Sequence, residues 1–102
     1  MMNDERLLSL LGLAQKAGKI VSGEMAVEKA IRNRSAKLLL VAADASESTK
    51  KNYQDMAAYY STPIFILLTK DQLGVSIGKI SRAALAVTDT GFNKAILKLL
   101  TM

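Results

Sequence analysis

Residues 37–43, "KLLLVAA", constrain the fold more than any other stretch of the chain. Apolar side chains follow one another here without alternating with polar ones, so neither face of a strand formed by this stretch suits water. The uninterrupted apolar run, residues 38–43, has six residues, whereas a membrane-spanning helix needs about 20. The sequence therefore predicts an inner strand of a sheet that helices cover on both faces, and no interaction with a membrane.

Shorter apolar strands and amphipathic helices alternate along the rest of the chain. The spacing of apolar residues predicts strands at residues 19–22, 64–68 and 83–88, and helices near residues 4–16, 23–33, 53–60, 69–78 and 92–99. The 102 residues are enough for one domain and too few for two. Strands alternating with helices predict an α/β fold, a three-layer α/β/α sandwich in a single domain.

The composition argues against most kinds of active site. The chain has no cysteine and no histidine, so it lacks thiol chemistry, the commonest general base and the commonest metal ligand. We expect no metal site and no cofactor. Asp4 and Glu5 precede the apolar stretch that begins at Leu7, the reverse of the basic start of a secretory signal. Together with the absence of cysteine, this predicts a soluble cytoplasmic protein.

Two catalytic arrangements are conceivable, and each has a simpler explanation. Asp44 and Asp89 both follow apolar strands, where α/β sheets place ligands, but aspartate after a strand is also ordinary turn or capping chemistry. Ser76 with Lys79, or Ser81 with Arg82, could form a nucleophile pair, yet nothing in the sequence orients them. We therefore expect no catalysis, although a small nucleotide-binding enzyme remains an alternative.

The stretch "LGVSIGKI", residues 73–80, resembles a phosphate-binding P-loop that lacks one residue. Three residues separate its glycines instead of four, and Lys79 is followed by Ile80 instead of the serine or threonine that would hold magnesium. Its apolar residues stand beside cationic ones, a combination that suits an unstacked base and its phosphate. These residues are Val75, Ile77, Gly78, Lys79, Ile80 and Arg82. Alternatively, the apolar residues return to the core between two elements.

Positive charge is concentrated before the inner strand. The formal net charge is +5, and residues 16–37 hold six basic residues against two acids. This excess favours a surface that attracts polyanions, or a solvated basic face without a partner. On a helical wheel, the helix predicted from residue 23 places four residues on its core face: Ala26, Val27, Ala30 and Ile31. Met25, Lys29 and Arg32 fall on the opposite face, with Glu28 beside them.

Two segments carry a resemblance to a known family. "SGEMAVEKAIRNRSAKLLLVAADAS" and "TKDQLGVSIGKISRAALAVTDTGFNKAIL" resemble the L7Ae/L30e family of ribosomal proteins over residues 22–97, and the start "LLGLAQKAGK" is similar to short bacterial members. The resemblance implies a four-stranded mixed sheet and binding to kink-turn or related internal-loop RNA. By position, Gly23 opens the helix that contacts purine pairs, Lys29 matches a phosphate-binding lysine, and residues 79–82 match a loop that covers a flipped-out base. The sequence departs from the family at Met25 and Ala26, which replace its polar pair, Asn or Lys followed by Glu or Gln.

We therefore expect one L7Ae/L30e-like RNA-binding domain over residues 1–102, a monomer without catalysis, whose partners are a structured RNA and the ribosome. The predicted RNA-binding residues are Gly23, Glu24, Met25, Lys29, Arg32, Val75, Gly78, Lys79, Ile80, Ser81 and Arg82. Because the polar pair is missing, a protein-interaction module on the same fold is the alternative function.

Overall fold

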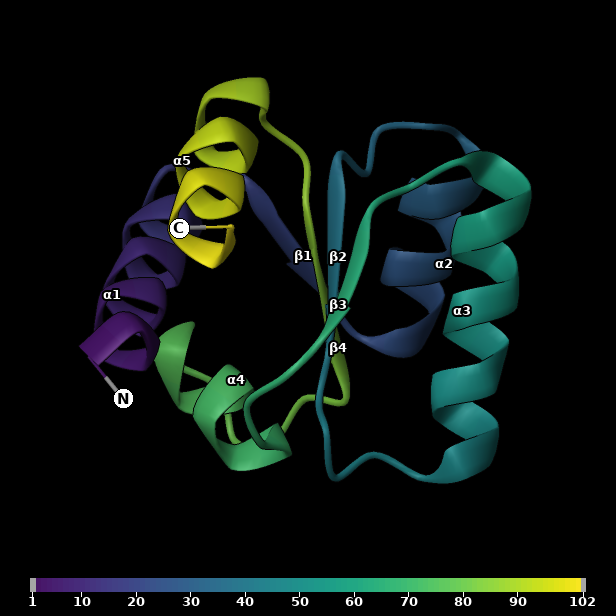
Figure 1. The fold of residues 1–102 in the computed structure, drawn as a ribbon, viewed down its shortest axis with the longest axis horizontal. Helices are drawn as coiled ribbons and strands as arrows, with labels where there is room; N and C mark the ends of the chain where they lie inside the picture. Colours follow the sequence, from purple (N-terminus) through teal and green to yellow (C-terminus); the bar gives the residue numbers. More distant parts are fainter. Residues whose placement is uncertain (1, 102) are drawn as a thin grey trace.

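A four-stranded sheet lies between two helical layers (Figure 1), as we predicted from the apolar stretch at residues 37–43. The computed structural model describes residues 2–101, and side chains from residue 4 onward. The elements are α1 (Met2–Lys16), β1 (Ile20–Ser22), α2 (Glu24–Arg32), β2 (Leu38–Val41), α3 (Glu47–Tyr60), β3 (Ile64–Ile66), α4 (Lys70–Ser76), β4 (Ala84–Val87) and α5 (Thr90–Leu100). The predicted order of helices and strands is confirmed.

The sheet has the strand order β1-β4-β2-β3 and is mixed. β4 pairs antiparallel with both β1 and β2, whereas β2 and β3 are parallel. Every residue of β2 and of β4 is buried, because these two inner strands have a helical layer on each face. The prediction of an inner strand is confirmed by β2. In register, Val41 at the end of β2 faces Ala84 at the start of β4.

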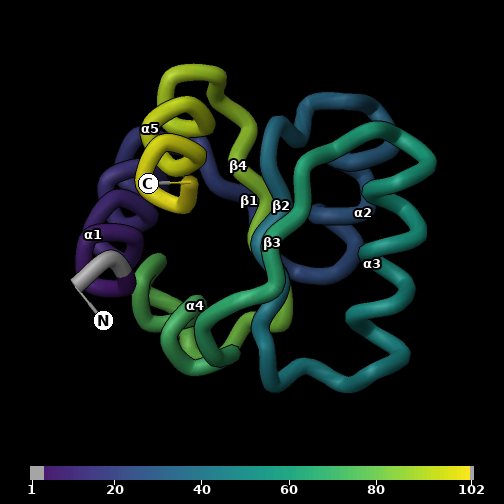
Figure 2. The backbone as a smooth tube through the Cα atoms, viewed as in Figure 1, coloured from purple at the N-terminus to yellow at the C-terminus, as the bar shows by residue number. Residues whose placement is uncertain are grey.

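The two helical layers consist of different helices (Figures 1 and 2). α1, α4 and α5 cover one face of the sheet, and α2 and α3 cover the other. Leu7 and Leu11 of α1 and Ile96 of α5 are fully buried on the first side, and Val27 and Ile31 of α2 on the second. The expected α/β/α sandwich is therefore confirmed. Within the described chain, no helix combines the length and the apolar character needed to cross a membrane.

The strand predicted at residues 64–68 is shorter than expected, since β3 ends at Ile66. Leu68 has a φ of 64°, a left-handed conformation that a strand cannot contain. Its carbonyl oxygen accepts the N–H of Ala43 at 2.8 Å, so the chain turns here while staying bonded to the segment after β2. Thr69 then begins α4 with a capping box to Gln72, as the sequence predicted.

Candidate nucleic-acid interface

The segment between α4 and β4 is a helix end rather than a phosphate-binding loop. Gly78, with a φ of 74°, donates its N–H to the carbonyl of Val75 at 3.0 Å, and Lys79 donates to Gly74 at 2.8 Å. These two bonds form a Schellman motif, in which a left-handed glycine closes the helix. The N–H groups that a P-loop would direct at phosphate are thus bonded to the helix itself.

The first glycine of this segment, Gly74, has a packing role. It is buried in α4, and a Cβ atom built on it would collide with the carbonyl oxygen of Ile80. The same Cβ would lie 2.6 Å from the carbonyl carbon of Ile80 and 2.9 Å from Cα of Ser81. The chain beyond Gly78 therefore folds back directly onto the helix, and only a residue without a side chain fits at this crossing.

Folding back places two of the three apolar residues of the segment in solvent. Val75 is 73% exposed and Ile80 is 88% exposed, with Lys79 exposed between them. Ile77, however, is only 5% exposed, so for this residue the alternative, a return to the core, is the correct one. Ile77 is the last residue before the left-handed glycine, and two residues after Val75 a helix has turned by about 200°, which directs Ile77 into the core.

Arg82 joins this segment to the start of α2. Its Nε donates to the hydroxyl of Ser22 at 3.3 Å, and its Nη1 donates to the carbonyl of Ser81 at 2.7 Å. Its backbone N–H donates to the carbonyl of Lys70 at 3.1 Å. Because Ser22 directly precedes Gly23, two predicted halves of the site that are 60 residues apart in sequence meet here.

The first turn of α2 presents unbonded backbone donors. Gly23 occupies the capping position with φ 91° and ψ 137°, and no described side chain caps the helix. The first helical bond is donated by Val27 to the carbonyl of Gly23 at 2.9 Å, so the N–H groups of residues 24–26 have no helical acceptor. Met25 is 85% exposed beside them. Backbone donors and an apolar side chain therefore share one surface.

Ala26 does not lie on the core face of α2, and the prediction that placed it there is wrong. Val27, Ala30 and Ile31 are buried, whereas Ala26 is exposed. On the wheel Ala26 lies about 95° from the centre of the buried group, at the edge of the contact with the sheet. Both family positions that differ in this chain, Met25 and Ala26, are therefore exposed to solvent.

The two cations on the outer side of α2 differ in whether they form an ion pair. Arg32 Nη2 lies 3.3 Å from Glu28 Oε1, an ion pair one turn apart on the helix surface. None of the ion pairs found among the described residues includes Lys29, which is exposed. Lys29 and Arg32 line one shallow hollow on the outer side of α2, and its other residues are Met25, Ala26 and Glu28. Lys29 therefore offers its full charge to an anionic ligand, and Arg32 shares its charge with Glu28.

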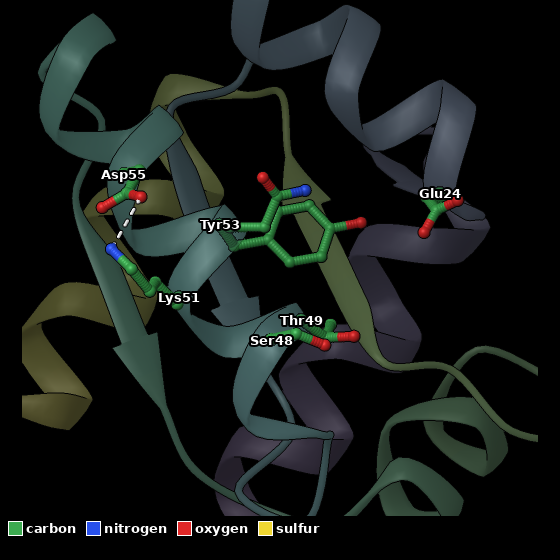
Figure 3. A pocket seen from close by; sticks show the side chains of 7 residues that line it. Glu24, Ser48, Thr49, Lys51, Tyr53 and Asp55 are labelled. Carbon is green, nitrogen blue, oxygen red and sulfur yellow. Dashed lines mark hydrogen bonds and ion pairs between the residues drawn. The ribbon is translucent and has the colours of Figure 1, made fainter.

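A hollow of about 280 Å³ lies where α2, α3 and the segment before β4 come together. Its lining consists of Gly23, Glu24, Thr49, Tyr53, Ser81, Arg82, Ala83 and Ala84. A second hollow between α2 and α3 shares Glu24, Thr49 and Tyr53 with it (Figure 3). Burial, and the negative charges of Glu24 and Glu28, raise the pKa of Tyr53 to about 12.

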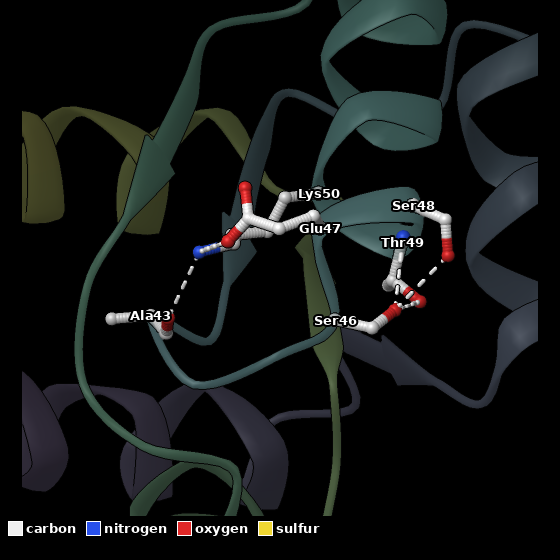
Figure 4. A network of polar contacts seen from close by, with 6 residues as sticks. All are labelled: Ala43, Ser46, Glu47, Ser48, Thr49 and Lys50. Carbon is white, nitrogen blue, oxygen red and sulfur yellow. Dashed lines mark hydrogen bonds and ion pairs between the residues drawn. The ribbon is translucent and has the colours of Figure 1, made fainter.

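The start of α3 was missed as part of this region. Ser46 accepts the N–H of Thr49 at 3.1 Å and donates its own hydroxyl to Thr49 Oγ1 at 2.8 Å (Figure 4). Lys50 Nζ lies 2.9 Å from Glu47 and donates to the carbonyl of Ala43 at 3.2 Å. A signal was present in the sequence, because the hydroxyl-rich stretch "SEST", residues 46–49, comes a short turn after a buried strand.

Three of the conceivable catalytic groups, Asp44, Asp89 and Ser76, have structural roles. Asp44 accepts the N–H of Lys70 at 2.9 Å, and Asp89 caps α5 by accepting the N–H of Phe92 at 2.9 Å. The two aspartates follow antiparallel strands, so they lie at opposite ends of the sheet. The hydroxyl of Ser76 donates to the carbonyl of Leu73 at 2.8 Å. Turn and capping chemistry, the simpler explanation, accounts for both aspartates.

Comparison with known proteins gives concordant matches. The model of the ribosomal protein L7Ae/L30e/S12e/Gadd45 family matches residues 5–97. The RNA-binding protein YlxQ of Bacillus subtilis is 48% identical over 91 residues, which cover 89% of this chain and 91% of that protein. The large ribosomal subunit protein eL30 of Candida albicans is 32% identical over 91 residues, covering 87% and 86% of the two chains. A solved structure of a protein of unknown function from Bacillus halodurans superposes with a TM-score of 0.89 at 35% identity, covering 94% of this chain and 97% of the other.

Proposed function

Because the chain belongs to the ribosomal protein L7Ae/L30e/S12e/Gadd45 family, we propose that it is a non-catalytic RNA-binding protein consisting of one domain. A relative that is 48% identical carries the name RNA-binding protein, and another that is 32% identical is a ribosomal protein. The ligand is a structured RNA with an internal loop, of the kink-turn type or related to it. The ribosome is the place where we expect such an RNA to be met.

One observation supports this proposal above the others: Arg82 is bonded to Ser22, beside the uncapped start of α2. This contact joins the start of α2 to the end of the α4–β4 segment, and we propose that the predicted residues on both sides form one surface, here called the RNA face. It consists of Gly23, Glu24, Met25, Lys29 and Arg32 on the α2 side, and Val75, Gly78, Lys79, Ile80, Ser81 and Arg82 on the α4–β4 side. Backbone donors, cations and exposed apolar side chains are what an irregular RNA requires.

Each group on the RNA face has a separate task in the proposal. Lys29 and Lys79 hold phosphates, helped by Arg32 and by the part of Arg82 that is not bonded within the protein. Met25, Val75 and Ile80 pack against an unstacked base. The N–H groups at the start of α2 donate hydrogen bonds to a phosphate or to the edge of a base.

Met25 and Ala26 set the kind of recognition. Neither side chain can form the hydrogen bonds to purine edges that the family's polar pair would form. Each such bidentate pair is worth about 1–3 kcal/mol of discrimination, by analogy with base recognition in DNA. We infer that the protein selects its RNA by shape, stacking and phosphate position, with less discrimination among bases than its relatives with the polar pair.

Filter binding of an internal-loop RNA across a salt series tests the proposal. The logarithm of the binding constant should fall by roughly 0.7–0.9 per logarithmic unit of salt for each phosphate contacted. Lys29→Ala should lower the affinity by about tenfold and reduce that slope by one contact, with no change in melting temperature, since Lys29 is exposed. A matched control is Lys94→Ala, which removes an exposed lysine from α5 in the other helical layer.

Two results would contradict this assignment. A flat salt response would remove the electrostatic contribution, and a lower melting temperature for Lys29→Ala would assign the residue a structural role. An equal loss of affinity for Lys94→Ala would show that total charge matters instead of the position of Lys29.

A protein-interaction module is the second candidate, because Met25, Val75 and Ile80 are large apolar side chains in solvent. Such a module would bind another protein through these three side chains and would have lost RNA binding together with the polar pair. Size-exclusion chromatography of an extract, before and after nuclease treatment, distinguishes the two. Complexes that survive nuclease and are lost in Met25→Ser favour the protein partner.

A further inference from the structure

Two tyrosines at the end of α3 form a surface cluster far from the start of that helix. Tyr59 is 78% exposed, although it is one of the few aromatic residues in the chain. Its ring meets that of Tyr60 in a T-shaped arrangement, with centroids 4.8 Å apart and planes at 76°. Tyr60 is half-buried and packs against the core, so it holds Tyr59 in place from one side.

Arg34, just beyond the end of α2, completes this cluster. Its guanidinium carbon lies 5.5 Å from the centroid of the Tyr60 ring, and its Nη1 donates to the carbonyl of Tyr60 at 3.2 Å. Arg34 also has a φ of 63°, a conformation that costs an ordinary residue about 1 kcal/mol or more. The contacts with Tyr60 offset this cost. Arg34, Tyr59 and Tyr60, together called the tyrosine cluster, are therefore ordered before any ligand arrives.

The charges around the tyrosine cluster are mostly positive. Residues 29–43 contain four exposed cations and no acid; the cations are Lys29, Arg32, Arg34 and Lys37. Residues 56–69, which include both tyrosines, contain no acid, and Asp55, one turn before Tyr59 on α3, is paired with Lys51 at 3.1 Å. Glu28, already paired with Arg32, is the nearest carboxylate in the sequence of α2. These charges favour an anionic partner and disfavour a cationic one.

α2 connects the tyrosine cluster to the RNA face. The helix starts at the RNA face and ends next to Arg34, and Lys29 and Arg32 lie along its outer side between the two. Its nine residues span about 14 Å at 1.5 Å per residue. A strand of RNA leaving the RNA face could follow these cations and reach Tyr59 within a few nucleotides.

We propose that the tyrosine cluster is a second RNA contact, in which Tyr59 stacks on an unpaired base while Arg34 and Lys37 hold the adjacent phosphates. An exposed aromatic ring flanked by cations is the arrangement by which proteins bind single-stranded nucleic acid. The proposal rests on the proposed function and extends it, since it adds a single-stranded segment to the internal-loop RNA. Recognition by stacking is tolerant of sequence, because every base has an aromatic face.

The test uses two RNA probes that differ in one feature. One is an internal-loop duplex with blunt ends, and the other is the same duplex with a tail of about ten uridines on either strand. The tailed RNA should bind the wild-type protein more tightly. Tyr59→Ala should abolish this gain, a loss of roughly 5- to 150-fold for one stacked base, and should leave the blunt RNA unaffected. Tyr59→Phe retains the ring and should retain the gain.

A spectroscopic readout separates stacking from a structural effect. The chain has no tryptophan and three tyrosines, so its intrinsic fluorescence comes from tyrosine alone. Stacking on a base should quench part of this emission when the tailed RNA binds, and that part should be absent in Tyr59→Ala. The melting temperature should not change, since Tyr59 is exposed.

The outcomes distinguish this proposal from the function on which it rests. If Lys29→Ala weakens both RNAs and Tyr59→Ala weakens neither, the tyrosine cluster is not an RNA contact, while the RNA face stands. Equal affinity of the blunt and tailed RNAs also overturns the second contact. If neither RNA binds the wild-type protein, both proposals fail, and a protein partner for the exposed tyrosine becomes the better explanation.

Discussion

The two sides of the RNA face are built in opposite ways. On the α4–β4 side the backbone is fixed by internal bonds: a capping box at Thr69, a Schellman motif at Gly78, and the close crossing at Gly74. On the α2 side the helix starts at Gly23 without a side-chain cap, and its first turn is exposed. One side is determined by the fold, and the other keeps free backbone donors, to which we propose that the RNA binds.

This difference separates the motif residues that the fold itself requires from those that it does not require. The pattern "LG" followed by "GK" four residues later has a full structural explanation, because each glycine meets a requirement of the backbone without any RNA. The exposed positions at Met25 and Ala26 have no structural requirement of that kind. The glycine pattern is therefore evidence for the fold, and the departures at the start of α2 are evidence about the ligand.

The largest expected effect is on the α4–β4 side, from Gly74→Ala. The added methyl group would collide with the backbone of Ile80 and Ser81, which cannot rotate away as a side chain could. We expect a loss of about 3 kcal/mol in the free energy of unfolding, at the upper end for overpacking in a core. Urea denaturation followed by circular dichroism measures it.

Gly78→Ala is the matched control for this prediction. A Cβ atom at Gly78 has nothing within 4 Å, so its cost comes from the left-handed backbone conformation alone. That cost is about 1 kcal/mol. Similar losses for the two variants would show that the crossing at Gly74 is less tight than described, and that both glycines serve conformation only.

The next effect is on the α2 side, where substitution should change binding and not stability. Met25→Asn combined with Ala26→Glu restores a polar pair of the family type at two exposed positions. Affinity for a kink-turn RNA should rise by roughly 5- to 150-fold, corresponding to about 1–3 kcal/mol for one bidentate contact. The melting temperature should change little, because neither residue is buried.

The control for this variant is the same RNA with its sheared purine pairs replaced by Watson–Crick pairs. Its affinity should not rise, since the restored side chains would find no matching edges. An unchanged affinity for the kink-turn RNA itself would mean that the first turn of α2 does not contact the purine pairs.

The sequence was sufficient for the fold because its strongest signals are periodic. The buried strand at residues 38–41 and the stripes on α1, α3 and α5 are repeated patterns, and repetition averages out local exceptions. The errors occur at single positions. A helical wheel gave the direction of the core but not the width of the covered face, so Ala26 was misplaced. Ile77 and Leu68 depend on left-handed backbone at or beside them, which apolar spacing does not reveal.

The exposure of the predicted site residues could partly be predicted from the sequence, and their surroundings could not. Exposed Met25 and Ile80 followed from their positions opposite the core and beyond a helix end. The hydrogen bond from Arg82 to Ser22 and the hollow shared with Thr49 could not be predicted, because they depend on how β4 lies beside β1 and how α3 lies beside α2. Contacts between distant segments follow from topology, and single-sequence patterns do not give register.

The smallest effect tests how far the α4–β4 side depends on its caps. Thr69→Ala removes the acceptor for the N–H of Gln72, which lies 3.1 Å from the threonine hydroxyl, and should lower the free energy of unfolding by about 1 kcal/mol. Gln72→Ala breaks only the reciprocal bond to the N–H of Thr69, 2.9 Å long, and should cost less. RNA affinity should not change in either, because Gly74 and the Schellman motif still hold residues 78–82 in place. If Thr69→Ala lowers the affinity as well, the cap at the start of α4 also positions the RNA face, and the α4–β4 side is less rigid than its hydrogen bonds indicate.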